Sequence, residues 1–238
     1  MSRMFPFITE TWNPFKGRCP YECSYCWARN MAKRYKHLKE KYFTDEQGID
    51  EKQINRKFKP GAFVFVQDMS DASTASLGDV ARVMTVIKLN PKTMFLFLVK
   101  NPRAYLQWID HIATRPPDNV ILGATIETDD PQLIRQHSKA PSPQSRLESL
   151  YELSKIGLKT FISVEPIMDF NPRLNAAISL IGPWAIAVGY DNYHSNLPEP
   201  SLAKTMKLIE DLENGGIDVY RKTLRESTSS KELRRDAP

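Results

Sequence analysis

Short apolar runs alternate with longer segments of helical period along most of this 238-residue chain, and this alternation constrains the fold more than any other feature. Five runs are rich in β-branched and aromatic residues: Phe63–Gln67, Met94–Val99, Val120–Ile126, Thr160–Val164 and Trp184–Val188. Near-continuous apolar runs of this length are typical of strands buried on both faces. Further strands are expected at Phe7–Thr11 and Ile217–Tyr220.

Helical period marks the segments between these runs. The expected helices are Leu77–Lys88, Pro102–Thr114, Ser145–Ile156, Pro172–Ile181 and Leu202–Asn214. Strands that alternate with helices predict parallel β-α-β units with right-handed crossovers. We therefore expect an α/β fold, a partial (β/α)6 TIM-like barrel of parallel strands, with a doubly wound open sheet as the alternative. In both arrangements functional side chains gather at the carboxyl ends of the strands.

The length of the chain suits one domain of the larger sort. We expect this domain to cover residues 1–226, with a charged, poorly periodic insertion at 33–60 that forms one helix and surface loops. Residues 227–238 are polar and are expected to form a flexible tail. No apolar run reaches the about 18 to 20 residues that span a bilayer, and the first ten residues do not resemble a signal peptide. These features predict a cytoplasmic protein without membrane association.

The chain carries a formal charge of +5 and has a pI of about 9.0. Lys and Arg are in excess between Lys33 and Lys59. A basic balance of this size is compatible with a nucleic-acid partner but does not by itself indicate one.

All three cysteines, Cys19, Cys23 and Cys26, lie in one motif with the spacing C-x3-C-x2-C. An odd number this closely packed is a poor disulfide framework, and clustered thiols in a reducing compartment favour metal binding. A structural zinc site needs four ligands, with His37 as a candidate fourth, so zinc stays a minor alternative. Thiolates also hold iron–sulfur clusters, and three thiolates on a four-iron cluster leave one iron open to another ligand.

With Tyr25 in the aromatic position, the motif resembles the radical S-adenosylmethionine signature, C-x3-C-x-aromatic-C. Three further segments resemble a phage-associated family of that superfamily with no assigned activity: Glu10–Gly17, Phe65–Asp71 and Phe161–Pro166. Ala140–Ser142 with Arg146-Leu147 is similar to spore photoproduct lyase relatives. The resemblance implies a [4Fe–4S] cluster that binds S-adenosylmethionine at its open iron and cleaves it reductively to methionine and a 5′-deoxyadenosyl radical. That radical would then abstract hydrogen from a substrate, which the resemblance does not identify.

Polar side chains follow the expected strands at their carboxyl ends. Under the resemblance, Lys100 would pair with the carboxylate of S-adenosylmethionine through a charge-assisted hydrogen bond. Gln67, Asp68 and Ser70 would receive its ammonium group, and Glu127 would accept from the ribose hydroxyls. The alternatives are structural, because Asp is a favoured helix cap and Lys100 precedes a natural helix start.

Three more residues complete the expected site. Arg146 would hold either the carboxylate of the cofactor or Glu127, and Gly189 would let the backbone approach the adenine closely. No cysteine lies outside the motif, which disfavours the activity of spore photoproduct lyase itself. Tyr190 is therefore the candidate hydrogen donor, with a packing role as its alternative.

These observations predict a radical S-adenosylmethionine enzyme that acts on an unknown substrate. A nucleic acid or nucleotide is the first hypothesis, and a small molecule or peptide is the second. A non-catalytic iron–sulfur sensor or electron carrier is the alternative from a different class, although an electron carrier would normally close the open iron with a fourth ligand. An enzyme of this class needs an external electron donor of flavodoxin or ferredoxin type.

Overall fold

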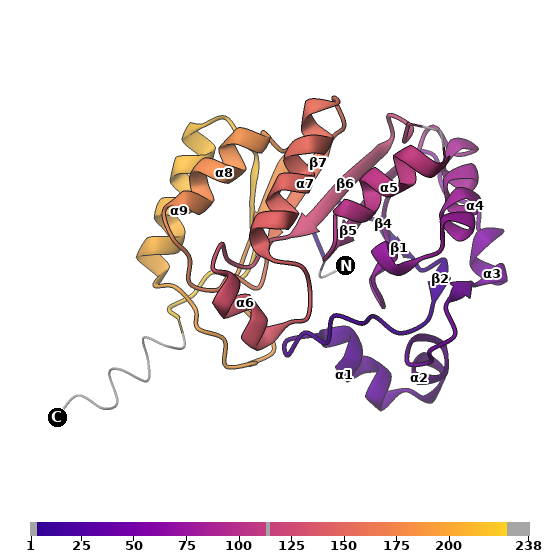
Figure 1. The fold of residues 1–238 in the computed structure, drawn as a ribbon, viewed down its shortest axis with the longest axis horizontal. Coiled ribbons are helices and arrows are strands. Elements are labelled where there is room, and N and C mark those ends of the chain that lie inside the picture. Colours follow the sequence, from indigo (N-terminus) through magenta and orange to yellow (C-terminus); the bar gives the residue numbers. More distant parts are fainter. Residues whose placement is uncertain (1–3, 113–114, 228–238) are drawn as a thin grey trace.

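The computed structural model describes residues 4–112 and 115–227, and its centre is a curled sheet of seven parallel strands (Figure 1). In order along the sheet, the strands are β1 (Glu10–Trp12), β4 (Phe63–Val66), β5 (Met94–Val99), β6 (Val120–Thr125), β7 (Thr160–Val164), β8 (Ala185–Val188) and β9 (Val219–Arg221). A doubly wound sheet would reverse this order at a switch point. The order is sequential instead, which confirms the partial TIM-like barrel, with seven strands where six were expected.

Helices follow the strands and cover one face of the sheet. They are α4 (Leu77–Lys88), α5 (Arg103–Ile112), α7 (Pro143–Lys155), α8 (Arg173–Ile181) and α9 (Leu202–Asn214). The end of α7 shows why Gly157 is required there: with φ +74°, it allows Leu158 N to donate to Leu153 O at 3.1 Å. This bond and the one from Gly157 N to Ser154 O form a Schellman motif, which satisfies carbonyls that the helix end leaves open.

The two faces of the sheet have separate cores. The outer face packs against the helices through residues such as Val64, Phe97 and Ile162. The inner face carries its own cluster, which includes Phe65, Leu96, Ile121 and Phe161. The N-terminal segment supplies Phe5 and Phe7 to this inner cluster, so the first strand begins at Glu10 rather than at Phe7.

The segment after β1 is more regular than the sequence indicates. It contains the short antiparallel pair β2 (Phe15–Lys16) and β3 (Gly48–Ile49) and the helices α1 (Trp27–Arg34), α2 (Lys36–Tyr42) and α3 (Glu51–Ile54). The expectation of one helix within 33–60 is therefore wrong, because helices of seven and four residues are too short to show an apolar period. A 3-10 turn, η1 (Ala72–Thr74), and α6 (Pro131–His137) complete the elements that the structure describes.

The expected tail, 227–238, lies outside the described residues except for Ser227. Within 4–112 and 115–227, no helix combines the length and the apolar character that crossing a membrane would need.

Candidate functional site

The three cysteines lie in the loop between β2 and α1, near the carboxyl edge of the sheet. Cys26 is the N-cap of α1, and its Sγ accepts a hydrogen bond from Arg29 N at 3.4 Å. Cys23 is buried, and its Sγ lies 3.1 Å from the hydroxyl of Ser138. All three thiols are free and contact one small apolar cluster, so they lie in the same part of the fold.

The donor set suits an iron–sulfur cluster better than zinc. Among the described residues, no three His, Cys, Asp or Glu side chains form a ready-made metal site, so the thiols would have to turn toward an incoming metal group. His37, the candidate fourth zinc ligand, is exposed in α2 and its ring lies beside that of Tyr35. Three free thiols, with no fourth metal ligand grouped with them in the described part of the chain, fit a cluster with one open iron.

The cysteine loop is fastened to the segment that follows β6. Ser24 N donates to the carbonyl of His137 at 2.8 Å, and Lys139 N donates to the carbonyl of Tyr21 at 2.7 Å. The Ser24 hydroxyl also lies 3.1 Å from His137 Nδ1. These contacts hold the loop against the end of α6.

Tyr25, the aromatic residue of the motif, joins the loop to a buried ionic group that we call the rim network: Tyr25, Lys100, Glu127 and Arg146. The Tyr25 hydroxyl donates to Glu127 Oε1, which also pairs with Lys100 Nζ. Lys100 Nζ lies 3.1 Å from the Tyr25 hydroxyl. Arg146 Nη1 donates to Glu127 Oε2 at 2.8 Å and to the carbonyl of Thr125 at 2.9 Å. Four predicted site residues thus meet at the ends of β5 and β6.

The two cations of the rim network keep the carboxyl group of Glu127 ionised. Glu127 and Arg146 are fully buried, whereas the Lys100 side chain is 15% exposed. Burial by itself would raise the pKa of Glu127, but the charges of Lys100 and Arg146 outweigh it and lower the pKa to about 2. Arg146 Nη2 is buried without a hydrogen-bond partner. Such a donor is rare in folded proteins, and an anionic group of a ligand would satisfy it.

The residues predicted to receive the ammonium group form a second network, at the end of β4. Gln67 holds the main chain of Phe15 through both ends of its amide, and its Nε2 donates to the Ser70 hydroxyl at 2.8 Å. Asp68 accepts from Asn13 Nδ2 at 2.5 Å. These bonds fasten the loop after β4 to the loop after β1.

Asp71, in the loop after β4, contacts the rim network through the backbone of Lys100. Its Oδ1 accepts from Ser73 N at 2.9 Å, as a cap would, while its Oδ2 accepts from Lys100 N at 2.8 Å. Asp71 is 6% exposed, and burial raises its pKa. The backbone of Lys100 is thereby held by the loop that follows the neighbouring strand, β4.

Gly189 and Tyr190 are not part of either network. A Cβ atom at Gly189 would lie 2.6 Å from the Cβ of Lys222, so the glycine permits a close approach within the chain itself. The side chain of Tyr190, the candidate hydrogen donor, is fully buried in the outer core, which favours the alternative packing role. The Tyr190 hydroxyl donates to the carbonyl of Pro200 at 3.2 Å and lies 2.8 Å from the hydroxyl of Thr205.

Glu165 and Lys222, which the sequence pattern does not single out as site residues, form an ion pair on the inner face, and their charged atoms are 3.5 Å apart. Glu165 follows β7 and Lys222 follows β9, so both lie at carboxyl ends. Lys222 Nζ also donates to the carbonyl of Met4. Strand alternation could have found Glu165, because it lies two residues beyond Ser163 and four beyond the inward-facing Phe161.

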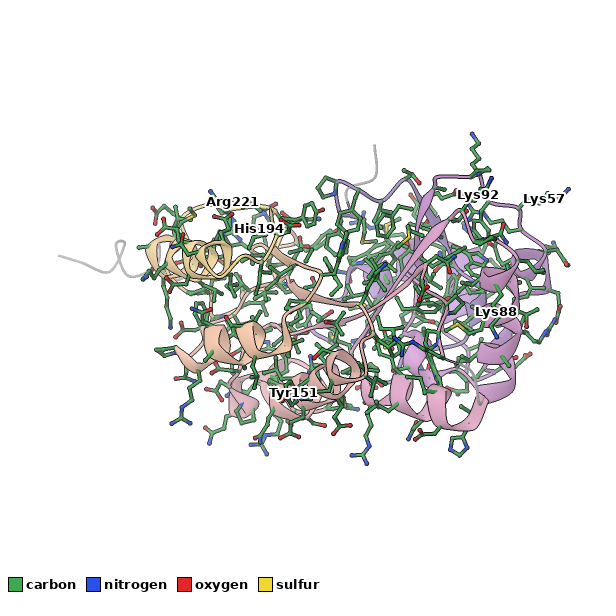
Figure 2. The ribbon with its side chains drawn as sticks, turned by 90° about the horizontal axis from the view of Figure 1, so that it is seen from above. Lys57, Lys88, Lys92, Tyr151, His194 and Arg221 are labelled. Atoms are coloured by element: carbon green, nitrogen blue, oxygen red, sulfur yellow. The ribbon has the colours of Figure 1, made fainter. Side chains whose placement is uncertain are left out.

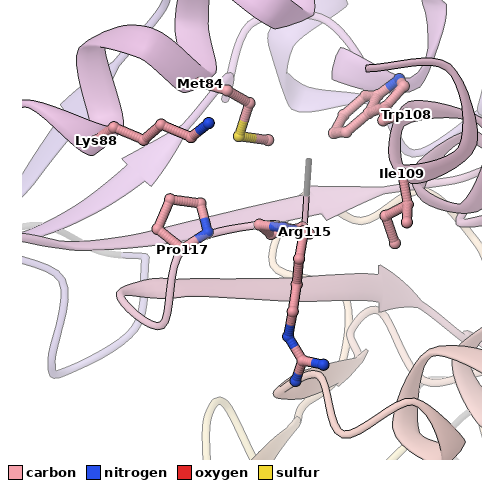
Figure 3. A pocket seen from close by; sticks show the side chains of 7 residues that line it. Met84, Lys88, Trp108, Ile109, Arg115 and Pro117 are labelled. Atoms are coloured by element: carbon pink, nitrogen blue, oxygen red, sulfur yellow. The ribbon is translucent and has the colours of Figure 1, made fainter. Parts of the chain in front are cut away.

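One small surface pocket lies at the other end of the strands (Figure 3). It is lined by residues that include Met84, Lys88, Trp108 and Pro117, and Lys88 and Pro117 precede β5 and β6. None of the predicted site residues lines it. The candidate site is therefore the rim at the carboxyl ends, not this pocket.

A family model described as "Protein of unknown function (DUF5131)" matches residues 4–207. The chain belongs to this family. No protein of curated function matches the sequence.

Solved structures share the fold of this DUF5131 chain. A mutant spore photoproduct lyase with bound AdoMet and dinucleoside spore photoproduct is similar with 11% identity and a TM-score of 0.60, over 94% of this chain and 80% of that one. SuiB of Streptococcus suis bound to S-adenosylmethionine is similar with 9% identity and a TM-score of 0.54. The alignment covers 92% of this chain but 51% of SuiB, so the chain spans about half the length of SuiB. Both are radical S-adenosylmethionine enzymes, and at these identities the likeness shows the fold they share.

Proposed function

We propose that this protein is a radical S-adenosylmethionine enzyme, with a [4Fe–4S] cluster held by Cys19, Cys23 and Cys26. One observation carries the proposal: the Tyr25 hydroxyl, within the cysteine motif, bonds to Glu127 and contacts Lys100 at the ends of β6 and β5. This contact joins the cysteine loop to a group with two cations, Lys100 and Arg146, in a parallel half-barrel, which supports the proposal. S-adenosylmethionine, which carries a carboxylate and would bind the cluster, needs a cation close to the loop that holds the cluster.

When bound, the cluster and S-adenosylmethionine would supply the electron-driven cleavage that yields a 5′-deoxyadenosyl radical. The protein's own residues would hold and orient the reactants. Lys100 is the partly exposed cation of the rim network and would pair with the carboxylate of the cofactor. Glu127 is engaged on both oxygens, so its main role would be to hold Lys100, Tyr25 and Arg146 in place, with its remaining lone pairs open to the ribose.

Arg146 would offer its unpartnered Nη2 to the same carboxylate. Gln67 and Ser70 would present polar atoms to the ammonium group from the end of β4, next to the loop they fasten. These assignments follow from the position of each side chain at the rim and from the motif that the sequence resembles.

We further propose a nucleic acid or a nucleotide as the substrate class. Support comes from the fold shared with spore photoproduct lyase, which was solved with a dinucleoside photoproduct and of which this chain covers 80%. SuiB, solved with its precursor peptide SuiA, has a TM-score of 0.55 and is covered over 52% of its length. The resemblance to a phage-associated family stays a prediction, because the matching family model has no described function.

Anaerobic reconstitution with iron and sulfide tests the cluster directly. We expect a four-iron cluster with the visible absorption of [4Fe–4S], lost in Cys23→Ala, and a change in the electron paramagnetic resonance of the reduced cluster when S-adenosylmethionine is added. A cluster whose spectrum does not respond to the cofactor would favour the non-catalytic sensor or electron carrier. Tight binding of zinc without any iron would exclude both the radical enzyme and the non-catalytic iron–sulfur protein.

A further inference from the structure

The positive charge of the chain is concentrated in one segment. Residues 27–42, which form α1 and α2, contain six Lys and Arg residues and one acidic residue, Glu40. Taking six from the 33 basic residues and one from the 28 acidic residues leaves 27 of each in the rest of the chain. The whole formal charge of +5 therefore comes from two short helices, which we call the basic patch.

Most cations of the basic patch have no anionic partner. Lys33, Arg34 and Lys39 are exposed, and within the described part of the chain none of the three forms an ion pair. Lys36 lies 3.7 Å from Glu40, with both side chains largely in solvent, so this pair neutralises little. Only Lys41 has a partly buried partner, Asp50. The charge is free to act on another molecule.

An aromatic side chain lies among these charges. Tyr35, between α1 and α2, is 48% exposed, and its ring centroid lies 6.0 Å from that of His37. Exposed Tyr beside Arg is a combination enriched at protein–protein interfaces. The basic patch therefore offers both a charged surface and an anchoring ring.

The basic patch begins at the cysteine loop itself. α1 starts directly after Cys26, whose Sγ is bonded to the main chain of Arg29. Cys19 and Cys26 are only partly buried, while Tyr25 extends into the rim network. Figure 1 shows α1 and α2 together at one end of the molecule, apart from the helices that cover the sheet. The patch thus lies on the solvent side of the loop, and the rim network lies on its barrel side.

We propose that the basic patch docks a small acidic electron-carrier protein of flavodoxin type, which delivers one electron to the cluster. The inference rests on the proposed function, because reductive cleavage needs an electron from outside the chain. The donor loses one electron and the cluster gains one, and no bond forms or breaks in this step. Complementary charge would speed the encounter and align the donor with Cys19 and Cys26.

The size of the patch favours a compact protein over a nucleic acid. The helices have 8 and 7 residues and are about 12 and 10 Å long. The rest of the chain is balanced in charge and so supplies no net excess to continue a basic track along a phosphodiester backbone. A nucleic-acid substrate would also have to reach the rim network, on the other side of the loop.

The test compares two matched charge reversals in the reconstituted protein. Lys33→Glu/Lys39→Glu changes the last turns of α1 and α2. Lys88→Glu/Lys92→Glu makes the same change of charge at the amino-terminal end of β5 (Figure 2). We would measure the binding of a purified acidic flavodoxin at low and high salt, and the rate at which reduced flavodoxin bleaches the cluster. Dithionite serves as the small reductant that needs no docking surface.

We expect the first variant to lose about tenfold or more in flavodoxin affinity and reduction rate, with a weaker salt dependence. The second should match the wild type, and dithionite should reduce all three proteins alike. Lys33→Gln/Lys39→Gln should show a smaller loss, and it replaces the reversal if that variant does not fold. Unchanged binding and reduction in both patch variants would overturn the proposal.

Patch-dependent binding of a DNA or RNA oligonucleotide, with no effect on flavodoxin, would overturn it equally. Failure of the proposed function is distinct from both outcomes, because it appears in the wild type as the absence of a cluster or of cofactor cleavage with dithionite.

Discussion

The two ends of the half-barrel's inner face differ in composition, although the same strands form both. From the amino end to the middle of the strands, aromatic side chains pack together: Phe5, Phe7, Phe63, Phe65, Phe161, Trp184 and Tyr220. At the carboxyl end, the inward positions are polar: Gln67, Lys100, Glu127, Glu165 and Lys222. Along β4 and the residue after it, the inward positions change from aromatic at Phe65 to polar at Gln67, two residues later.

The difference shows how one sheet can separate stability from chemistry. The aromatic end buries large apolar surfaces and is closed by the N-terminal segment, whose Phe5 ring lies 5.0 Å from that of Phe161. The polar end holds charges that are costly to bury and retains them through pairing. Substitutions at the two ends should therefore have different consequences.

The largest expected effect is at the aromatic end. Phe161→Ala removes a fully buried ring that contacts Phe5 and Phe7, and should lower the free energy of unfolding by about 3 to 5 kcal/mol. Urea denaturation measures the loss. Trp184→Ala, at the 36% exposed margin of the same cluster, is the control and should cost clearly less. Equal losses would mean that the inner cluster is not a packed core.

Glu127→Gln tests the polar end. It leaves Arg146 fully buried without its carboxylate partner, which should cost about 3 kcal/mol of stability and weaken the hold on Lys100. The urea midpoint measures this cost. Glu148→Gln, on the exposed side of α7, serves as the control and should be nearly neutral. A neutral Glu127→Gln would show that the rim network is not held by its charge.

Acid should expose the same dependence in the wild type. The folded-state pKa of Glu127, about 2, lies below its ordinary value of 4.5, so the carboxylate stabilises the fold above pH 4.5. That contribution is lost as the pH falls from 4.5 toward 2. Stability curves over this window should be flatter for Glu127→Gln than for the wild type. Parallel curves would contradict the low pKa.

Lys100→Met should weaken the binding of S-adenosylmethionine about tenfold, because a charge-assisted bond to the carboxylate is removed. Glu127 keeps Arg146 as a partner, so the fold should survive. Equilibrium binding to the cluster-loaded protein gives the affinity. Lys139→Met removes an exposed pair with Glu22 on the cysteine loop and should leave it unchanged. Similar losses in both variants would point to a general charge effect.

Tyr25→Phe is the smallest change. It removes one hydroxyl that bonds Glu127 and keeps the ring, so stability should fall by about 1 kcal/mol. Iron content after reconstitution should stay at the wild-type level while cofactor affinity decreases. A loss of iron instead would assign the hydroxyl to assembly of the metal site.

The sequence predicts the barrel well because its strands are near-continuous apolar runs. β5 and β7 and the helices α4 and α9 match their expected bounds. The short elements between β1 and β4 could not be predicted from hydrophobic periodicity. β2 and β3 have two residues each and α3 has four, which is too few to show a period. The aromatic residues of the N-terminal segment suit a strand and suit packing across the inner face equally well. The sequence therefore predicted a strand from Phe7, where the structure has side chains packed on the inner face.

The sequence predicted where part of the site lies, because its residues follow the strands at their carboxyl ends. Lys100 and Glu127 were expected there to bind different groups of a cofactor, and the structure shows that they also form an ion pair with each other. Tyr190 lies two residues beyond Val188, which faces the outer core, so alternation would have placed it under α9. The orphaned donor of Arg146 and the capping of α1 by Cys26 depend on side-chain geometry that no spacing rule supplies.

Formation of 5′-deoxyadenosine tests the central claim most directly. The reconstituted protein would be incubated anaerobically with dithionite and S-adenosylmethionine, and the products separated by chromatography. We predict that 5′-deoxyadenosine and methionine appear, and that Ala at Cys19, Cys23 or Cys26 abolishes both. A [4Fe–4S] protein that binds the cofactor yet yields neither product, with nucleic acids and nucleotides supplied as substrates, would contradict the account.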